Sequence, residues 1–237
     1  MFALAPFFSA YTQSDLFGKM VFLGLFFLSF ISWVVLIHKW FLMRRLKKLG
    51  HQFENLLSQH GAHFLSFNVE NSLCTSHPYC EIFRILKQKT IELLNKNREY
   101  AIKKEEVTLS QFDIEWIETH LETTLSSQIK EMEKNLFILS TVVTLAPFLG
   151  LLGTVWGISI TFANLHGSAA AMGNSAVLSG LAMALGTTVV GLVVAIPALV
   201  AYNYLRNSIR DFAKELEIFS HRLLSTVEIQ YRKVDLQ

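Results

Sequence analysis

Side chains able to bind a metal gather in residues 58–80. Within that stretch an H-x2-H pair precedes a C-x2-H-x2-C pattern, formed by His60, His63, Cys74, His77 and Cys80. Zinc is bound by Cys and His side chains at spacings of this kind. The alternative interpretation is a cytoplasmic loop whose two cysteines are free thiols in a reducing compartment. Spacing leaves both interpretations open, and we assign the chain neither a metal nor a cofactor.

A second set of polar groups, the hydroxyls of Thr154 and Thr188, lies within strongly apolar sequence. Two small-x-x-x-small motifs accompany them, Gly153-x-x-x-Gly157 and Gly180-x-x-x-Ala184. Such motifs let helix backbones approach closely in a membrane. The same regions contain further small or helix-bending residues: Pro147, Gly150, Gly186, Gly191 and Pro197. The pattern predicts a tight helix bundle, whose threonines either line a polar interior or bond to their own helices.

The sequence does not contain the residue groupings of an enzyme. No G-x-S-x-G motif surrounds Ser159, Ser168, Ser175 or Ser179. The segment "GSAAAMGNS" resembles a phosphate-binding loop but lacks the lysine that would reach the phosphates. We therefore predict a protein that is not an enzyme, and a net charge of +2 gives no reason to expect nucleic-acid binding.

The elements that must position these residues are membrane helices. The chain is 51% hydrophobic and only 17% charged, and residues 135–205 contain no Asp, Glu, Lys or Arg. Because a bilayer core is crossed by about 20 apolar residues per helix, that run holds two spans. A third span lies near the N-terminus, where the uncharged run 20–37 is followed by basic residues. Without a basic region before it or a cleavage site after it, this segment predicts an uncleaved anchor rather than a signal peptide.

The distribution of Lys and Arg predicts the orientation. Residues 42–134 hold thirteen of them and the tail from 205 holds six, whereas the loop 163–175 holds none. Basic residues accumulate on the cytoplasmic side, so the N-terminus faces the periplasm and the tail faces the cytoplasm. The predicted segments are a periplasmic 1–16, a span 17–41, a cytoplasmic helical domain 42–135, a span 136–162, a periplasmic loop 163–175, a span 176–204 and a cytoplasmic tail 205–237.

The cytoplasmic segments are predicted to be mostly helical. An apolar stripe with steps of three to five residues runs through Phe112, Trp116, Leu121, Leu125, Ile129, Met132 and Leu136. No Pro or Gly separates this stripe from the second span, so we expect one unbroken helix from the cytoplasm into the membrane as far as Pro147. The tail continues the third span as an amphipathic helix. The resulting fold class is all-α, with three transmembrane helices of which the second and third extend into the cytoplasm.

Two long stretches, "APFLGLLGTVWGISITF" (146–162) and "ALGTTVVGLVVAIPALVAYN" (184–203), resemble the TolQ/ExbB/MotA family of proton-channel subunits. The matching positions include Pro147, Gly150, Gly153, Thr154, Trp156, Gly157, Thr188, Gly191 and Pro197. In the first span, "LSFISW" (28–33) is similar to the first helix of TolQ. We therefore favour a TolQ-like over an ExbB-like protein.

The resemblance implies an assembly and a mechanism. Such subunits form a pentamer in the bacterial inner membrane, with their second and third spans around a pore. Inside the pore lie the single spans of a TolR- or ExbD-like partner, whose membrane Asp carries protons. The proton motive force then drives a TolA- or TonB-like protein that acts on the outer membrane. Thr154 and Thr188 match the pore-facing threonines of the family.

One position departs from the family pattern. Many TolQ and ExbB proteins have a Glu in the third span, in a pattern like "AEAL", where this chain has "AMAL" with Met183. Acids within a membrane are costly and are kept for function. The acid of the partner can suffice, with the two threonines holding water beside it. Alternatively, the chain is a non-conducting scaffold that has lost proton coupling. We favour the first interpretation.

Overall fold

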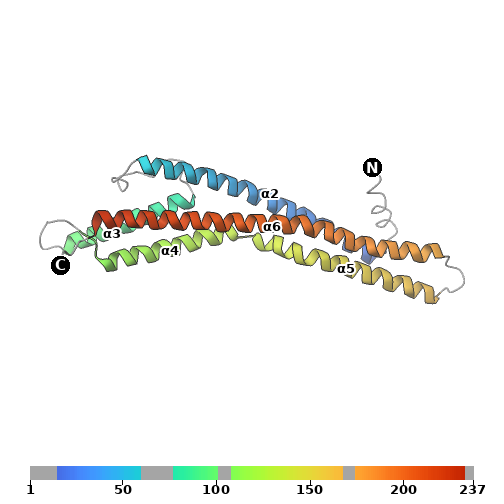
Figure 1. Cartoon of the computed structure of the whole chain (residues 1–237). Coiled ribbons are helices and arrows are strands. Elements are labelled where there is room, and N and C mark those ends of the chain that lie inside the picture. The colour runs from blue at the N-terminus through green and yellow to red at the C-terminus, as the bar shows by residue number, and fades with distance from the viewer. Residues whose placement is uncertain (1–14, 60–76, 101–107, 168–173, 233–237) are drawn as a thin grey trace. The chain divides into compact units, whose positions relative to one another are not determined.

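The structure is a computed structural model that describes residues 15–59, 77–100, 108–167 and 174–232. The chain divides into two compact units. We call Met1–Trp40 with Asn135–Arg206 the apolar unit, and Phe41–Lys134 with Asn207–Gln237 the polar unit. Five helices, labelled in Figure 1, account for the described residues almost entirely.

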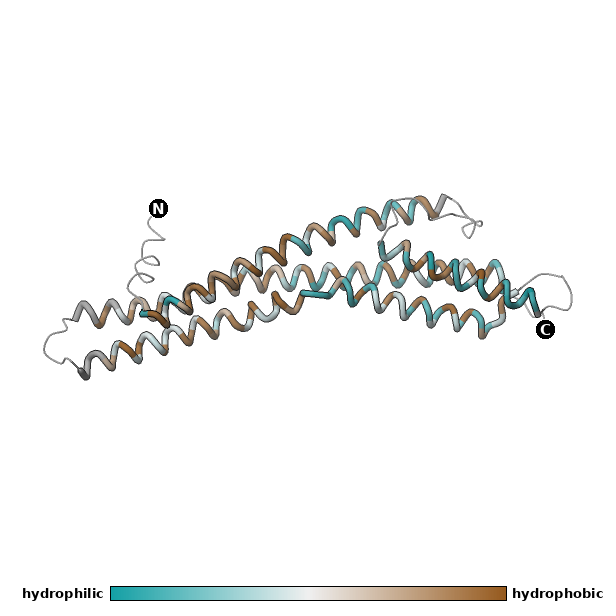
Figure 2. The backbone as a smooth tube through the Cα atoms, turned by 180° about the vertical axis from the view of Figure 1, so that it is seen from behind, coloured by the Kyte–Doolittle hydropathy of each residue, from teal (hydrophilic) through white to brown (hydrophobic). Residues whose placement is uncertain are grey.

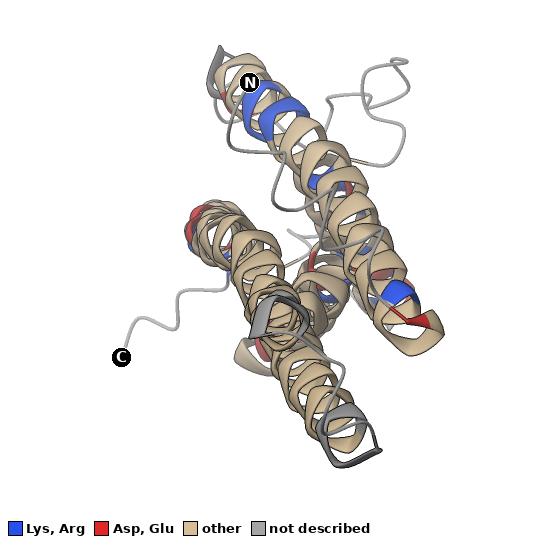
Figure 3. Ribbon diagram, turned by 90° about the vertical axis from the view of Figure 1, so that its right-hand side faces the viewer, with Lys and Arg blue, Asp and Glu red and all other residues tan. Residues whose placement is uncertain are grey.

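The apolar unit consists of the first part of α2 (Leu16–Gln59), all of α5 (Leu136–Gly167) and the first part of α6 (Asn174–Tyr231). Each of these helices contains a stretch long and apolar enough to cross a membrane. In Figure 2, which colours each residue by its hydropathy, the residues of these helices are mostly hydrophobic within this unit. In Figure 3, α5 and the start of α6 form long ribbons without charged residues. The protein is therefore an all-α membrane protein with three candidate spans.

The core of the apolar unit brings its three helices together. Val21 and Leu25 of α2 are buried with Ala146 of α5 and Ala195 of α6. Phe17, Leu149, Val190 and Val194 pack around this cluster. Large apolar side chains on the other helix faces stay exposed, for example Phe26, which is 74% exposed. Lipid tails are as apolar as these side chains, so an outward apolar surface is expected of membrane helices.

The polar unit contains α3 (Pro78–Tyr100), α4 (Gln111–Glu133) and the C-terminal parts of α2 and α6. Aromatic side chains form its centre: the ring of Phe53 lies 5.9 Å from Phe83 and 6.2 Å from Phe219. Tyr79 packs 4.7 Å from Phe219 and 5.7 Å from Phe212. Gly50 of α2 permits this packing, because a Cβ there would lie 2.9 Å from the Tyr79 ring.

A capping box starts α4. The Ser110 hydroxyl accepts the backbone N–H of Asp113, and the Asp113 carboxylate accepts the backbone N–H of Ser110 at 2.9 Å. Asn97 of α3 also donates to Asp113 at 3.1 Å. Burial by itself raises the pKa of the Asp113 carboxyl, but these hydrogen bonds outweigh burial and hold the pKa below its ordinary value. The backbone N–H of Leu109 donates to the Tyr231 carbonyl at 2.7 Å, which ties this start to the end of α6.

The sequence predicted one unbroken helix from the cytoplasm as far as Pro147. This prediction is wrong, because residues 134 and 135 interrupt the helix. Helix α4 ends at Glu133, and α5 begins at Leu136. Between them, Lys134 is the C-cap with extended backbone, and Asn135 has a φ of 68°. Asn adopts this left-handed conformation more readily than most residues, so it can end a helix where Gly and Pro are missing. Pro147 lies inside α5 and does not end it. The helical extension of the third span, by contrast, runs unbroken through α6.

The predicted stripe of α4 is displaced at its start. Phe112 is 74% exposed, whereas Ile114 and Ile117 are buried and lead into the buried Leu121. Met132 and Leu136, at the other end of the predicted stripe, are buried as expected.

Candidate functional site at the α5–α6 interface

Helices α5 and α6 approach each other through small residues. A Cβ added to Gly150 would lie 3.0 Å from the Thr187 carbonyl oxygen, and one added to Gly191 would lie 2.7 Å from the Ala146 carbonyl oxygen. Both contacts are with backbone atoms, which cannot easily move aside. A side chain at Gly191 would therefore clash with backbone, and one at Gly150 would require the α6 backbone to move by a few tenths of an ångström.

The two small-x-x-x-small motifs run antiparallel and meet at one pair of residues, Gly157 and Ala184. A Cβ on Gly153 would meet the Thr187 side chain, and a Cβ on Gly157 would lie 2.9 Å from the Cβ of Ala184. One turn further along, Gly180 faces the Thr161 side chain. Close approach of this kind maximises van der Waals contact, which drives helix association where lipid surrounds the helices.

Threonine hydroxyls converge on one backbone carbonyl of this interface. The Thr187 hydroxyl lies 3.0 Å from the Gly150 oxygen and 2.7 Å from the Ala184 oxygen of its own helix. The Thr188 hydroxyl lies 3.1 Å from the same Gly150 oxygen. A hydroxyl has one proton to donate and two lone pairs that accept, so each hydroxyl retains acceptor capacity. The interface thus holds a small polar centre in apolar surroundings.

The predicted pore residues differ in what surrounds them. Thr154 is 7% exposed, and its hydroxyl donates to the Leu151 carbonyl of its own helix at 2.7 Å. Thr188 is half-buried and bonds across the interface. Met183 is also half-buried, Pro147 is half-buried and Pro197 is exposed. Neither α5 nor residues 174–205 contain an Asp, Glu, Lys or Arg, and the polar contacts that Thr154, Thr187 and Thr188 make are with backbone carbonyls.

Thr187 was not among the residues predicted to line the pore, but it is the more deeply buried of the two adjacent threonines. It is 2% exposed and contacts both Gly150 and Gly153. The signal was present in the sequence: Thr187 follows Ala184 by three residues and precedes Gly191 by four, which is the spacing of a single helix face.

The His and Cys residues do not form a metal site within the described part of the chain. His60, His63 and Cys74 lie outside the described residues. His77 is buried, its Nε2 donates to the Leu46 carbonyl at 3.0 Å, and its Nδ1 accepts the Tyr79 N–H at 3.3 Å. Both ring nitrogens are therefore occupied. Among the described residues, no group of three or more His, Cys, Asp or Glu could hold a metal ion.

The expectation of free thiols is wrong for Cys80, which is disulfide-bonded. This side chain lies in the first turn of α3 and is 5% exposed. Sequence spacing carries no information on whether two sulfur atoms approach within bonding distance, because that depends on the three-dimensional path of the chain.

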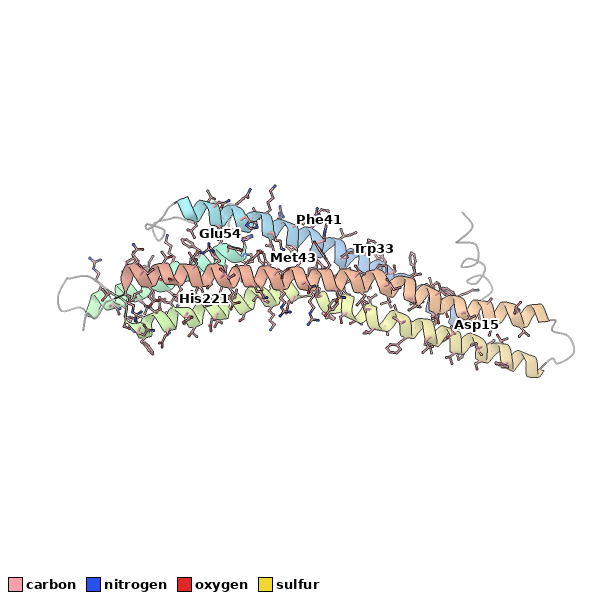
Figure 4. All side chains as sticks on the ribbon, in the orientation of Figure 1. Asp15, Trp33, Phe41, Met43, Glu54 and His221 are labelled. Atoms are coloured by element: carbon pink, nitrogen blue, oxygen red, sulfur yellow. The ribbon has the colours of Figure 1, made fainter. Side chains whose placement is uncertain are left out.

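Burial also sets the protonation of this region. It lowers the pKa of His77 below the ordinary value of 6.5, and the hydrogen bond to Leu46 only partly offsets the effect. Burial raises the pKa of Tyr79 to about 12, assisted by the negative charges of Glu215 and Glu54 and opposed by Arg222. Arg222 itself forms an ion pair with Glu54 (labelled in Figure 4), which joins α6 to α2 within the polar unit. These groups lie within the polar unit, where their contacts join its helices.

Comparison with known proteins agrees with this architecture. Residues 89–218, more than half of the chain, match the model of the MotA/TolQ/ExbB proton channel family. The biopolymer transport protein ExbB of Pseudomonas putida is 31% identical over 222 residues, covering 92% of this chain and 62% of that protein. ExbB of Aquifex aeolicus is 44% identical over 82 residues, which are 35% of this chain and 55% of that protein. A putative ExbB-like 2 protein of Helicobacter pylori is 43% identical over 90 residues, which are 38% of this chain and 59% of that protein.

Three apolar helices and a small-residue interface define a multi-pass helical membrane protein. With the match over residues 89–218, the chain belongs to the MotA/TolQ/ExbB proton channel family. The chain spans 55–62% of the length of the three relatives named above. Because these relatives carry the ExbB name, the comparisons support closeness to ExbB, while the preference for TolQ stays a prediction.

Proposed function

We propose that this chain is the channel-forming subunit of an inner-membrane complex that uses the proton motive force to drive a TonB- or TolA-like protein. The observation that carries the proposal is the α5–α6 interface, where glycines and threonines bring two charge-free helices together at Gly150. This interface lies within the residues matched by the family model. The chain acts without catalysing a covalent reaction, and it needs no cofactor.

The proposed assembly follows from the resemblance. Five copies surround a pore bounded by α5 and α6, and a single-span partner of the ExbD or TolR kind carries a membrane Asp inside it. Thr154, Thr188 and Met183 are proposed to lie on the proton path. Thr188 is the best supported of the three because it is half-buried and its hydroxyl also bonds across the α5–α6 interface. The N-terminus is proposed to face the periplasm and the C-terminus the cytoplasm.

The test is affinity purification of the tagged chain from native membranes, followed by native mass spectrometry. The proposal expects five copies together with a small single-span protein that has a membrane Asp. A homo-oligomer alone, or one with a partner that lacks a membrane acid, would contradict it.

Substitution of Thr188 by Val tests the role of the interface hydroxyl. We expect assembly to stay intact, because Val has nearly the shape of Thr, and proton-driven uptake to fall about tenfold or more, because the hydroxyl beside the Gly150 carbonyl is lost. Uptake is measured with a siderophore-type substrate in cells that carry the variant as their sole copy. Thr141→Val is the matched control, since Thr141 is exposed and its hydroxyl donates to its own helix at Phe137. Uptake equal to wild type in both variants would count against a proton path at Thr188.

A second candidate function is a non-conducting scaffold. The observation in its favour is the complete lack of Asp and Glu from α5 and from the first 37 residues of α6, with Met183 in place of the family acid. It predicts the same homo-oligomer without proton flux. The partner identified by mass spectrometry separates the two functions.

A further inference from the structure

Asp15 is the only Asp or Glu within residues 1–40 and 135–206, which form the apolar unit. It precedes α2, where its Oδ1 accepts the backbone N–H of Gly18 at 3.0 Å and its carbonyl accepts that of Lys19. Its second carboxylate oxygen, Oδ2, accepts the indole N–H of Trp156 at 3.0 Å. Figure 4 labels Asp15 at the start of α2, beside α5. One carboxylate thus caps one helix and binds a side chain of another.

Asp15 supplies an acceptor for Trp156. The Trp156 side chain is 40% exposed in the single chain, and its indole N–H is a donor only, so it requires a partner wherever the surrounding medium offers none. Its ring also packs 4.4 Å from the ring of Phe17, which lies in the first turn of α2. A carboxylate strengthens a hydrogen bond relative to a neutral acceptor. Asp15 and Phe17 together hold the Trp156 side chain against the start of α2.

The bond lies where α5 is also held by α6. Gly153 and Gly157, on either side of Trp156 in sequence, contact Thr187 and Ala184 of α6. Ala184 follows Met183, the position at which the family pattern has an acid. The turn 153–157 is therefore fixed on one side by the α5–α6 interface and on another by Asp15.

We propose that Asp15 is a positioning residue for the proton-driven cycle: its carboxylate binds Trp156 and so fixes the α5 turn 153–157 between α2 and α6. The inference rests on the proposed function and deepens it. It assigns a role to an acid that lies outside the pore motifs. Lys19, in the first turns of α2, is the charged residue nearest to Asp15 in the sequence, and α5 contains no Asp, Glu, Lys or Arg.

The test uses variants that separate the two bonds of Asp15. Asp15→Ser keeps a good N-cap for Gly18 but is too short to reach the indole. Asp15→Asn keeps an acceptor for the indole without the charge. Trp156→Phe keeps the ring against Phe17 but removes the donor. Each variant is expressed as the full chain with its partners, and the readouts are proton-driven uptake, assembly by native mass spectrometry, and ¹⁹F NMR of 5-fluorotryptophan.

We expect Asp15→Ser and Trp156→Phe each to lower uptake about tenfold or more with assembly unchanged. The double variant should be no worse than either single variant, because both remove the same bond. Asp15→Asn should stay within about threefold of wild type. The ¹⁹F resonance of Trp156, identified by its loss in Trp156→Phe, should shift in Asp15→Ser and stay near its wild-type position in Asp15→Asn.

Three outcomes would overturn the proposal. The first is wild-type uptake in Asp15→Ser, and the second is a loss of uptake in the double variant that equals the product of the losses in the two single variants. The third is that Asp15→Asn is as inactive as Asp15→Ser although its Trp156 resonance has not moved. The last would show that the charge or proton of Asp15 is used directly. If the wild-type complex itself drives no uptake, the proposed function fails. The ¹⁹F resonance still decides whether Asp15 positions Trp156.

Discussion

The two halves of α6 pack by opposite means. In the apolar unit, as far as Ala201, its buried residues are small, and they include Ala184, Thr187, Ala195, Ala198 and Ala201. In the polar unit they are large, and they include Ile209, Phe212, Leu216, Phe219 and Leu223. One continuous helix therefore changes its packing chemistry at the boundary between the units.

The difference follows from the solvent. In water, burial of a large apolar side chain is favourable by about 1.5–3 kcal/mol, so large residues stabilise the polar unit. In lipid that gain disappears, and close backbone contact between small residues takes its place. The hydroxyls of Thr187 and Thr188 can reach the Gly150 carbonyl only because the backbones are this close. The packing mode of the apolar unit thus creates the polar centre proposed for function.

Replacement of Phe212 by Ala should have the largest effect on stability. Phe212 is fully buried against Tyr79, so the loss should destabilise the polar unit by about 3–5 kcal/mol. Denaturant titration of the purified full chain in detergent, followed by near-UV circular dichroism, measures the change. Phe112→Ala is the matched control: its ring is 74% exposed, and the expected change is within about 0.5 kcal/mol. Equal effects of both variants would mean that aromatic burial does not stabilise this unit.

Replacement of Gly191 by Ala should have an intermediate effect on stability. It adds volume to the α5–α6 interface, whereas Phe212→Ala removes volume from the polar unit. Here a methyl group is added, and it would lie 2.7 Å from the Ala146 carbonyl oxygen. Overpacking of this kind costs about 1–3 kcal/mol and should separate α5 from α6. Thermal stability in detergent and the yield of oligomer measure it. Gly24→Ala is the control, because nothing lies within 4 Å of the added carbon. A stabilised Gly191→Ala variant would refute close backbone contact in the apolar unit.

A change of pH should have the smallest effect on the stability of the polar unit. The pKa of His77 is lowered in the folded chain, so below pH 6.5 the unfolded chain binds a proton that the folded chain does not. Stability should therefore fall as the pH drops below 6.5. Denaturant titrations at pH 7.5 and 5.5 test this expectation. The pH sensitivity should diminish in His77→Gln and persist in His51→Gln, since His51 is exposed. A loss of pH sensitivity in His51→Gln alone would contradict the assignment to His77.

Much of the apolar unit could be predicted from the sequence, because lipid imposes strong rules. Long uncharged runs predict spans, and the glycine motifs predict close helix contact. Which of Thr187 and Thr188 is the more deeply buried depends on how α6 is rotated about its axis. Two adjacent residues of the same type do not reveal this rotation. The bond between Asp15 and Trp156 was also out of reach, since it joins residues 141 apart in sequence.

The polar unit was harder to predict. The break at Asn135 carries no Gly or Pro, and its φ of 68° depends on the end of α4 at Lys134. The start of the buried stripe of α4 was misassigned because Phe112 is apolar yet exposed, while the capping box at Ser110 and Asp113 fixes the rotation of the first turn. The disulfide at Cys80 depends on tertiary structure, which spacing does not encode.

Proton flux through the reconstituted complex tests the central claim most directly, namely that this chain supports proton coupling with Met183 in place of an acid. The wild-type chain and its copurified single-span partner are placed in liposomes with an imposed pH gradient and membrane potential, and internal pH is followed with a fluorescent dye. We predict proton flux in the wild-type complex, and we predict that this flux is lost when the membrane Asp of the partner is replaced by Asn. No flux in the wild-type complex, with flux restored by Met183→Glu, would contradict it and establish the scaffold function.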